Sequence, residues 1–134
     1  MAGSLEGKKA VVTGASSGIG EATVEALVSE GAAVSAGARR RDRLEALAER
    51  VDGAVHVHEV DVTDEAAVLA AARQVREALG GETLAGLVNN AGVAVAGPVL
   101  EMSADDFRRQ MDINVIGPVI STQAFGPLLG ADRR

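Results

Sequence analysis

The apolar residues of the chain recur at two different spacings, and this alternation predicts its secondary structure. Short apolar or alternating runs predict strands, whereas apolar residues three and four positions apart predict helices. Strands and helices then alternate along the whole chain. The strands are expected at 8–13, 32–37, 54–60 and 84–89, and the helices at about 18–30, 42–51, 64–79 and 104–129.

Residues with special backbone chemistry mark where the predicted helices begin and end. Thr63 and Ser103 are placed as N-caps, followed by acidic residues that favour the positive end of a helix dipole. Gly31 stands where a glycine ends a helix in a left-handed conformation. Pro118 and Pro127 are expected to interrupt the last helix, because proline has no N–H to donate to the preceding turn.

The order of these elements predicts an α/β fold with a parallel sheet. Right-handed crossovers arrange the strands in the order 3-2-1-4, so the order reverses between the first and the fourth strand. Ligands of such sheets bind in the crevice at that reversal, beyond the carboxyl ends of the strands. The turns at 14–20 and 89–92 follow those two strands and are therefore expected to meet at a ligand site.

The turn after the first strand, residues 13–20, is rich in glycine and serine. Gly14 permits a tight turn, Gly18 leaves room for a pyrophosphate near the backbone, and Gly20 lets the helix pack closely. The helix that follows directs free N–H groups and its positive dipole end at the phosphates. A plain strand-to-helix turn is the alternative. The predicted dinucleotide contacts are Gly14, Ser16, Ser17, Gly18 and Ile19.

Composition excludes several kinds of partner. The formal net charge of −6 argues against general binding to nucleic acids or anionic membranes. The absence of cysteine excludes disulfides and thiolate metal sites. No apolar run reaches the roughly 18 residues of a membrane span, so we expect a cytoplasmic protein. His56 and His58 share one face of a predicted edge strand, which favours solvated histidines over a metal pair.

Basic residues follow the second strand, at the place where an acidic residue would mark a site for NAD. That acid would accept from the ribose 2′-hydroxyl, but Ala38 holds its place and Arg39 and Arg40 follow. Arginine pairs with a 2′-phosphate in a bidentate manner. Cations at a helix N-terminus also oppose the dipole, a cost that a bound phosphate offsets. The sequence therefore favours NADP over NAD; the alternative is a solvated basic surface.

The turns after the third and fourth strands offer further contacts to a nucleotide. An aspartate can accept from an adenine amino group, and the next N–H can donate to the ring. As an alternative, this aspartate is only a turn residue before the Thr63 cap. In the segment 89–92, asparagine amides can tie neighbouring loops while the backbone faces the ribose, although this sequence is also typical of an ordinary turn. The predicted contacts are Asp61, Val62, Asn90, Ala91 and Gly92.

Asn114 lies in the last predicted helix, four residues before Pro118. Because proline has no N–H, the Asn114 carbonyl is expected to lose its helical partner and the helix to bend. A free carbonyl beside the crevice can hold a catalytic water. The alternative is a packing kink whose carbonyl is satisfied by ordinary solvent.

With these residues in view, the chain resembles the short-chain dehydrogenase/reductase (SDR) family. Residues 13–20 match the cofactor motif of that family, including its glycine spacing, and 89–92 match its second motif. Asp61 matches its adenine-site aspartate, and Asn114 its catalytic asparagine. The resemblance implies a Rossmann-type, doubly wound fold and hydride transfer between NADP(H) and an alcohol or carbonyl substrate. It also implies a homo-oligomer, either a dimer or a tetramer.

The sequence departs from the family in its catalytic residues. The serine and the Tyr-x-x-x-Lys pair of the family follow a fifth strand, whereas this chain has no tyrosine, and its lysines are Lys8 and Lys9. We therefore expect strands five to seven to be absent, and residues 1–134 to be the NADP-binding, N-terminal half of an SDR subunit. Alone it should be inactive, because hydride transfer needs an acid beside the substrate oxygen. The alternatives are a non-catalytic NADP-binding module and an interaction fragment.

Overall fold

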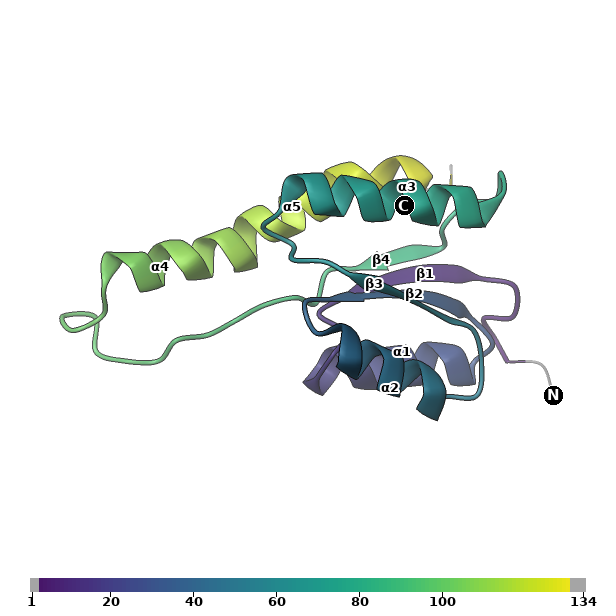
Figure 1. The fold of residues 1–134 in the computed structure, drawn as a ribbon, viewed down its shortest axis with the longest axis horizontal. Coiled ribbons are helices and arrows are strands. Elements are labelled where there is room, and N and C mark those ends of the chain that lie inside the picture. The colour runs from purple at the N-terminus through teal and green to yellow at the C-terminus, as the bar shows by residue number, and fades with distance from the viewer. Residues whose placement is uncertain (1–2, 131–134) are drawn as a thin grey trace.

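The computed structural model describes residues 3–130, which form a parallel sheet between two layers of helices (Figure 1). The strands are β1 (Lys9–Thr13), β2 (Ala33–Ala38), β3 (Val55–Glu59) and β4 (Gly86–Val88). The helices are α1 (Gly18–Ser29), α2 (Arg41–Arg50), α3 (Glu65–Leu79), α4 (Ala104–Met111) and α5 (Gly117–Phe125). A π-helical segment, Asp112–Ile116, joins α4 to α5, and a 3₁₀ turn, Gly126–Leu128, follows α5.

The sheet has the order β3-β2-β1-β4, and each neighbouring pair of strands is parallel. This arrangement confirms the predicted α/β fold and its strand order. β1 lies at the centre, with β2 on one side and β4 on the other. The turns that leave β1 and β4 are therefore neighbours at the carboxyl edge of the sheet, where the crevice was predicted.

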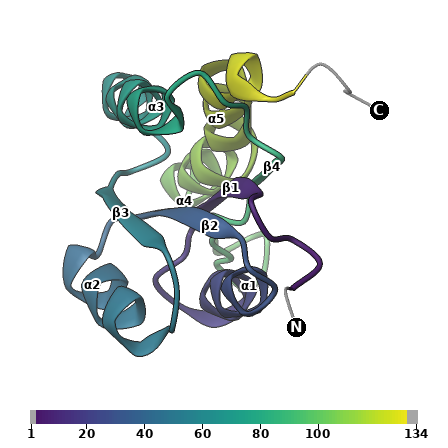
Figure 2. The same cartoon turned by 90° about the vertical axis from the view of Figure 1, so that its right-hand side faces the viewer.

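Both faces of β1 are buried, which explains why this strand is a continuous apolar run. Val12 packs in one core with Val24 of α1 and Leu44 of α2. Val11 points to the other face and packs with Val68 of α3 and other residues from α3 and α5. Figure 2 shows the same layers, with α1 and α2 on one side of the sheet and α3 and α5 on the other.

The fourth strand is shorter than the predicted segment 84–89, because only Gly86–Val88 pair with β1. Leu84 instead forms an isolated parallel bridge with Leu129. The Leu84 N–H donates to the Leu128 carbonyl at 2.8 Å, and the Leu84 carbonyl accepts from Gly130 at 3.2 Å. The chain that follows α5 therefore runs beside the approach to β4, which is the outermost strand on this side of the described sheet.

One of the two predicted helix caps is confirmed, and the other is wrong. The Ser103 hydroxyl accepts from the Asp106 N–H at 3.1 Å and caps α4 as predicted. Thr63 does not cap α3, because its hydroxyl donates to the Asp61 carboxylate at 2.8 Å. Asp64 takes that place by accepting from the Ala67 N–H at 3.1 Å.

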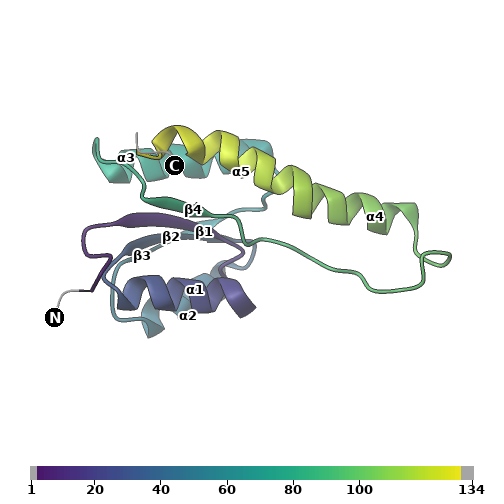
Figure 3. The same ribbon diagram turned by 180° about the vertical axis from the view of Figure 1, so that it is seen from behind.

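The last predicted helix is divided rather than kinked. Ahead of Pro118 the chain adopts the π-helical segment, in which the Gly117 N–H donates to the Asp112 carbonyl five residues earlier. This wider turn accommodates the missing N–H of Pro118 without a sharp bend. Figures 1 and 3 show α4 and the loop before it projecting beyond the sheet. We call residues 92–116, which comprise that loop, α4 and the π-helical segment, the arm.

None of the α4 residues is buried. Within residues 3–130, no helix combines the length and the apolar character that crossing a bilayer requires.

Candidate functional site

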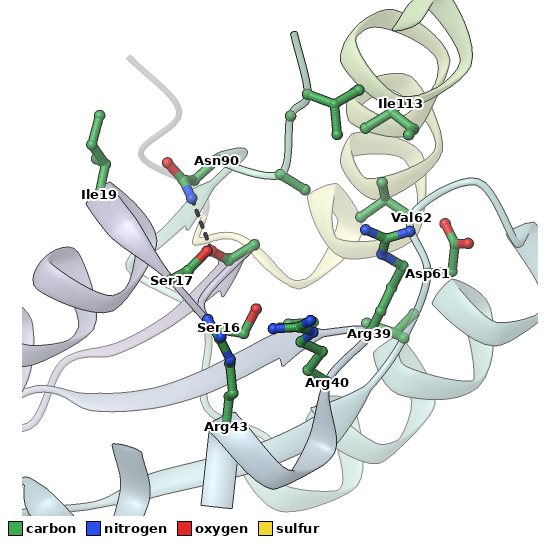
Figure 4. A pocket seen from close by; sticks show the side chains of 16 residues that line it. Ser16, Ser17, Ile19, Arg39, Arg40, Arg43, Asp61, Val62, Asn90 and Ile113 are labelled. Atoms are coloured by element: carbon green, nitrogen blue, oxygen red, sulfur yellow. Dashed lines mark hydrogen bonds between the residues drawn. The ribbon is translucent and has the colours of Figure 1, made fainter. Parts of the chain in front are cut away.

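The carboxyl ends of the strands open into a cleft of about 460 Å³, which Figure 4 shows from close by. Ligand pockets commonly have volumes of about 300–1,000 Å³. The lining comes from the ends of the strands and the turns after them, from the starts of α1 and α2, and from the arm. It consists of Gly14, Ser16, Ser17, Ile19, Ala38, Arg39, Arg40, Arg43, Val60, Asp61, Val62, Asn90, Ala91, Gly92, Val93 and Ile113.

The cleft brings together nearly all the residues predicted to contact a cofactor, although they come from distant parts of the sequence. Gly18 and Asn114 are the two predicted site residues outside its lining. Gly18 begins α1 at a φ of 57°, with open space around the position of a Cβ. Asn114 is hydrogen bonded to Val93, which lines the cleft. The ligand of this cleft stays a prediction.

Close contacts between backbone segments form the floor of the cleft. Gly14 has a φ of 65°, and a Cβ there would lie 2.7 Å from the Ala91 Cα. A Cβ on Gly20 would lie 2.0 Å from the Gly14 carbonyl oxygen. The Asn90 side chain donates to that same carbonyl at 3.1 Å, which is the loop tie predicted for these asparagines. The glycines are therefore required by close approach as well as by turn geometry.

Thr13 joins the two central turns and was not predicted as a site residue. Its buried hydroxyl accepts from the N–H groups of Asn90 and Ala91, both at 3.1 Å. The same hydroxyl lies 3.5 Å from the Val88 carbonyl, to which it donates. A hydroxyl residue at the end of an otherwise apolar strand is the signal in the sequence that could have identified this tie.

The helices that begin at the cleft lack side-chain caps. Ser17 precedes α1 and Arg40 precedes α2, and neither side chain hydrogen bonds to the first turn of its helix. Asp64 and Ser103, which lie outside the cleft lining, cap α3 and α4 with their side chains. The first N–H groups of α1 are thus left for water or a ligand, and an anion is the ligand they favour.

Asp61 stabilises the turn after β3 and also lines the cleft. Its carboxylate accepts from the Thr63 N–H at 2.9 Å and from the Thr63 hydroxyl. These bonds, chiefly the one from the backbone, lower the pKa of Asp61, and the positive charges of Arg39 and Arg109 add to this effect. Asp61 therefore stabilises its turn, although Thr63 is not the cap that this alternative assumed, and its contact with adenine stays a prediction.

Two side-chain amides that lie one helical turn apart join the helical part of the arm to its own loop, where Val93 lines the cleft. Asn114 accepts from the Val93 N–H at 2.8 Å and donates to the Val93 carbonyl at 2.7 Å. Gln110 accepts from the Val95 N–H at 3.1 Å. Gln110, Val93 and Ile113 are not among the predicted site residues; two amide side chains four positions apart were the available signal for Gln110.

The two histidines of β3 differ in their surroundings. His56 is exposed, as predicted, but His58 is partly buried and lies 3.1 Å from the Gln74 amide oxygen. Burial is the main cause of the lowered pKa of His58. Between residues 3 and 130 there is no cluster of three or more side chains suited to hold a metal ion.

A doubly wound parallel sheet with a glycine turn and an uncapped helix at its order reversal defines a dinucleotide-binding fold of the Rossmann type. A family model described as short chain dehydrogenase matches residues 8–134. The chain therefore belongs to the short-chain dehydrogenase/reductase family.

Relatives and solved structures agree with this assignment. The chain is 37% identical over 124 residues to the NADPH-dependent 3-dehydrocapnine reductase of Ornithobacterium rhinotracheale, covering 92% of this chain and 44% of that protein. It superimposes on a short-chain dehydrogenase/reductase from Serratia marcescens with a TM-score of 0.86, 40% identity, and 94% and 52% of the two chains covered. It also superimposes on NADPH-bound carbonyl reductase from chicken fatty liver, with a TM-score of 0.83 and 32% identity. That match covers 92% of this chain and 52% of the reductase chain. The chain spans about half the length of the curated relatives it matches.

Proposed function

We propose that this chain is the NADP(H)-binding part of an oxidoreductase that transfers hydride between the nicotinamide and an alcohol or carbonyl substrate. One observation carries the proposal: arginines from the β2–α2 turn face the same cleft as the uncapped start of α1. A pyrophosphate fits the helix start, and a 2′-phosphate fits the arginines. The NADPH-bound carbonyl reductase, which shares this fold, supports the choice of cofactor.

The residues of the cleft fit the parts of a dinucleotide in order. The glycine turn would hold the pyrophosphate, and Asp61 with Val62 would border the adenine. The backbone of 90–92 would lie along the nicotinamide ribose. The bound cofactor would supply the hydride, while the protein orients it and excludes water. Residues 1–134 would thus form one NADP-binding domain.

Asn114 is proposed to act next to the nicotinamide end of the cleft. Its side chain is engaged with Val93, so we assign the catalytic water to its main-chain carbonyl. The 134 residues contain no tyrosine. The acid that protonates a carbonyl substrate would therefore come from residues outside this sequence, and the chain by itself should bind the cofactor without turning it over.

Titration with NADPH, followed by the change in its fluorescence, tests the cofactor assignment. We expect saturable binding of NADPH and weaker binding of NADH. Arg39→Ala should weaken NADPH binding more than NADH binding, because only NADPH carries the 2′-phosphate. A flat titration with NADPH would contradict the proposal, and equal losses for the two cofactors would contradict the role of Arg39.

We also propose that the complete protein is a homo-oligomer. Phe107, Met111, Val115 and Val119 recur every four residues along α4, the π-helical segment and α5, and all four are exposed. An exposed apolar stripe of this kind is typical of an interaction surface. Sedimentation velocity tests this proposal, and a monodisperse monomer at high concentration would contradict it.

A further inference from the structure

The cleft has two sides that differ in the chemistry of their side chains. Arg39, Arg40 and Arg43 gather on the side of the β2–α2 turn, as Figure 4 shows. The arm contributes Val93 and Ile113 to the lining instead. A ligand in the cleft would therefore meet cations on one side and methyl groups on the other.

Val93 belongs to a longer apolar segment. Residues 91–100 contain no charged or polar side chain, and none of them is buried. Exposed apolar surface that is continuous in this way is typical of a site for a ligand or a partner. The segment continues directly from residues 90–92, whose backbone is proposed to lie along the nicotinamide ribose. Its first residues can therefore reach a molecule that lies beside the nicotinamide.

Hydrogen bonds within the arm engage polar backbone groups of this segment. The Val93 N–H and carbonyl both bond to the Asn114 side chain, and the Val95 N–H donates to Gln110 at 3.1 Å. Alternate residues thus bond to the helical part of the arm, as in an extended segment, where residues two positions apart share a face. Because Val93 lines the cleft, we expect Val95 to present its methyl groups on the same side.

The cations of the arm have acidic neighbours. Arg108 pairs with Asp105 at 2.9 Å, and the charge of Arg109 helps to lower the pKa of Asp61. A carboxylate placed against the two valines would lose water and gain neither a cation nor an N–H donor from them. An aliphatic group in the same place would bury apolar surface, which is favourable.

We infer that Val93 and Val95 form one side of the substrate site and select an uncharged ketone or secondary alcohol whose aliphatic part packs against them. This inference rests on the proposed function, because the substrate has to lie beside a bound nicotinamide. It narrows the class of substrate within that function. Oxo acids and sugar phosphates should be poor ligands, because their charge has no counterpart on the two valines.

Three ketones that differ only at the end remote from the carbonyl test this inference. Hexan-2-one ends in a methyl group, 5-hydroxypentan-2-one in a hydroxyl and 5-oxohexanoate in a carboxylate. Each is titrated into the whole chain saturated with NADP⁺, and NMR follows the methyl signals of Val93 and Val95. Hexan-2-one should bind about tenfold or more tightly than 5-oxohexanoate, and about fourfold more tightly than 5-hydroxypentan-2-one. The neutral hydroxyl compound separates polarity from repulsion by the net charge of −6.

A matched pair of variants locates the effect on the arm. Val95→Thr keeps the shape of the side chain and the backbone bond to Gln110, but it replaces a methyl group by a hydroxyl. It should weaken hexan-2-one binding by about fourfold, the value of one buried methyl group. Val99→Thr makes the same change in the turn before α4, where Val99 is 71% exposed and does not line the cleft. Its effect should stay within about twofold.

The outcomes separate the inference from the proposed function. Equal affinities for the three ketones, or no shift of either valine signal with hexan-2-one, would overturn the inference and leave NADP binding in place. Equal losses in Val95→Thr and Val99→Thr would also overturn it, because the effect would not belong to the cleft. If NADP⁺ itself does not bind, the proposed function is contradicted, and the inference falls with it.

Discussion

The two walls of the cleft differ in how they are held in place. One wall consists of the turns after β1, β2 and β3, which rise directly from a core in which Val12 and Leu44 are fully buried. The other wall consists of the arm, whose apolar residues are largely outside any core. Met111 is 52% exposed and Leu100 is 96% exposed.

The first wall is thus supported by packing against the core, whereas hydrogen bonds within the arm hold together the loop and the helical part of the second wall. Within the arm, the amides of Asn114 and Gln110 bind the backbone of Val93 and Val95 and so join the helical part of the arm to its loop. Segments with few buried apolar contacts open at a lower free energy than the core does. We therefore expect the phosphate side of the cleft to keep its shape when the arm is perturbed.

The largest effect should come from a cavity beneath the packed wall. Leu44→Ala should lower the free energy of unfolding by about 2–5 kcal/mol, because Leu44 is completely buried between α2 and the sheet. Met111→Ala in the arm removes a similar side chain and should cost less than about 0.5 kcal/mol. Urea denaturation compares the two variants, and similar costs would show that the walls do not differ in this way.

A smaller effect should come from crowding the floor of the cleft. Gly20→Ala places a methyl group 2.0 Å from the Gly14 carbonyl, so the start of α1 must shift, at a cost of about 1–3 kcal/mol. Gly126→Ala is the matched control, because nothing lies within 4 Å of its Cβ position. Thermal unfolding measures both variants. A Gly20→Ala protein as stable as the Gly126→Ala protein would contradict the close approach described here.

The ties of the arm should have local effects. Asn114→Ala removes two hydrogen bonds to Val93, and Gln110→Ala removes one to Val95, each worth about 0.5–1.5 kcal/mol. Hydrogen exchange should therefore become faster at the Val93 amide in the first variant and at the Val95 amide in the second. Exchange in β1 should stay unchanged in both variants. Faster exchange throughout the sheet would show that the arm supports the core.

The smallest effect should be on the dependence of stability on pH. Because the hydrogen bonds from Thr63 lower the pKa of Asp61 below 3.8, its carboxylate contributes stability that is present above that pH. This contribution is lost as the pH falls through the folded-state pKa. Urea midpoints of wild type should therefore fall between pH 5 and pH 3 by more than those of Asp61→Asn. Identical acid profiles would contradict the role of these bonds.

The packed wall could be predicted from the sequence to a much greater extent than the arm. Its strands, its order reversal and the positions of Gly14 and Arg39 all follow from local spacing and from topological rules. The ligand of the cleft and the role of each residue stay predictions. The Asn90 tie to Gly14 was expected in kind, although its partner atom was not.

What the sequence did not indicate depends on competition between groups. Threonine is a residue type that commonly caps helices, but the Thr63 hydroxyl donates to the Asp61 carboxylate. Asp64 caps α3 instead. A proline inside a helix usually predicts a kink, but here the five-residue π-helical segment before Pro118 accommodates its missing N–H.

The Thr13 hydroxyl has a consequence for the order in which the chain acquires structure. It bonds to amides 77 and 78 positions later, so the floor of the cleft cannot close until β4 has found β1. The part from β1 to β3 forms through short crossovers. The Thr13 contact instead closes a much longer loop, which costs more conformational entropy. The floor should thus be among the last parts to form, and a nucleotide that touches both turns would act as a template that favours this final step.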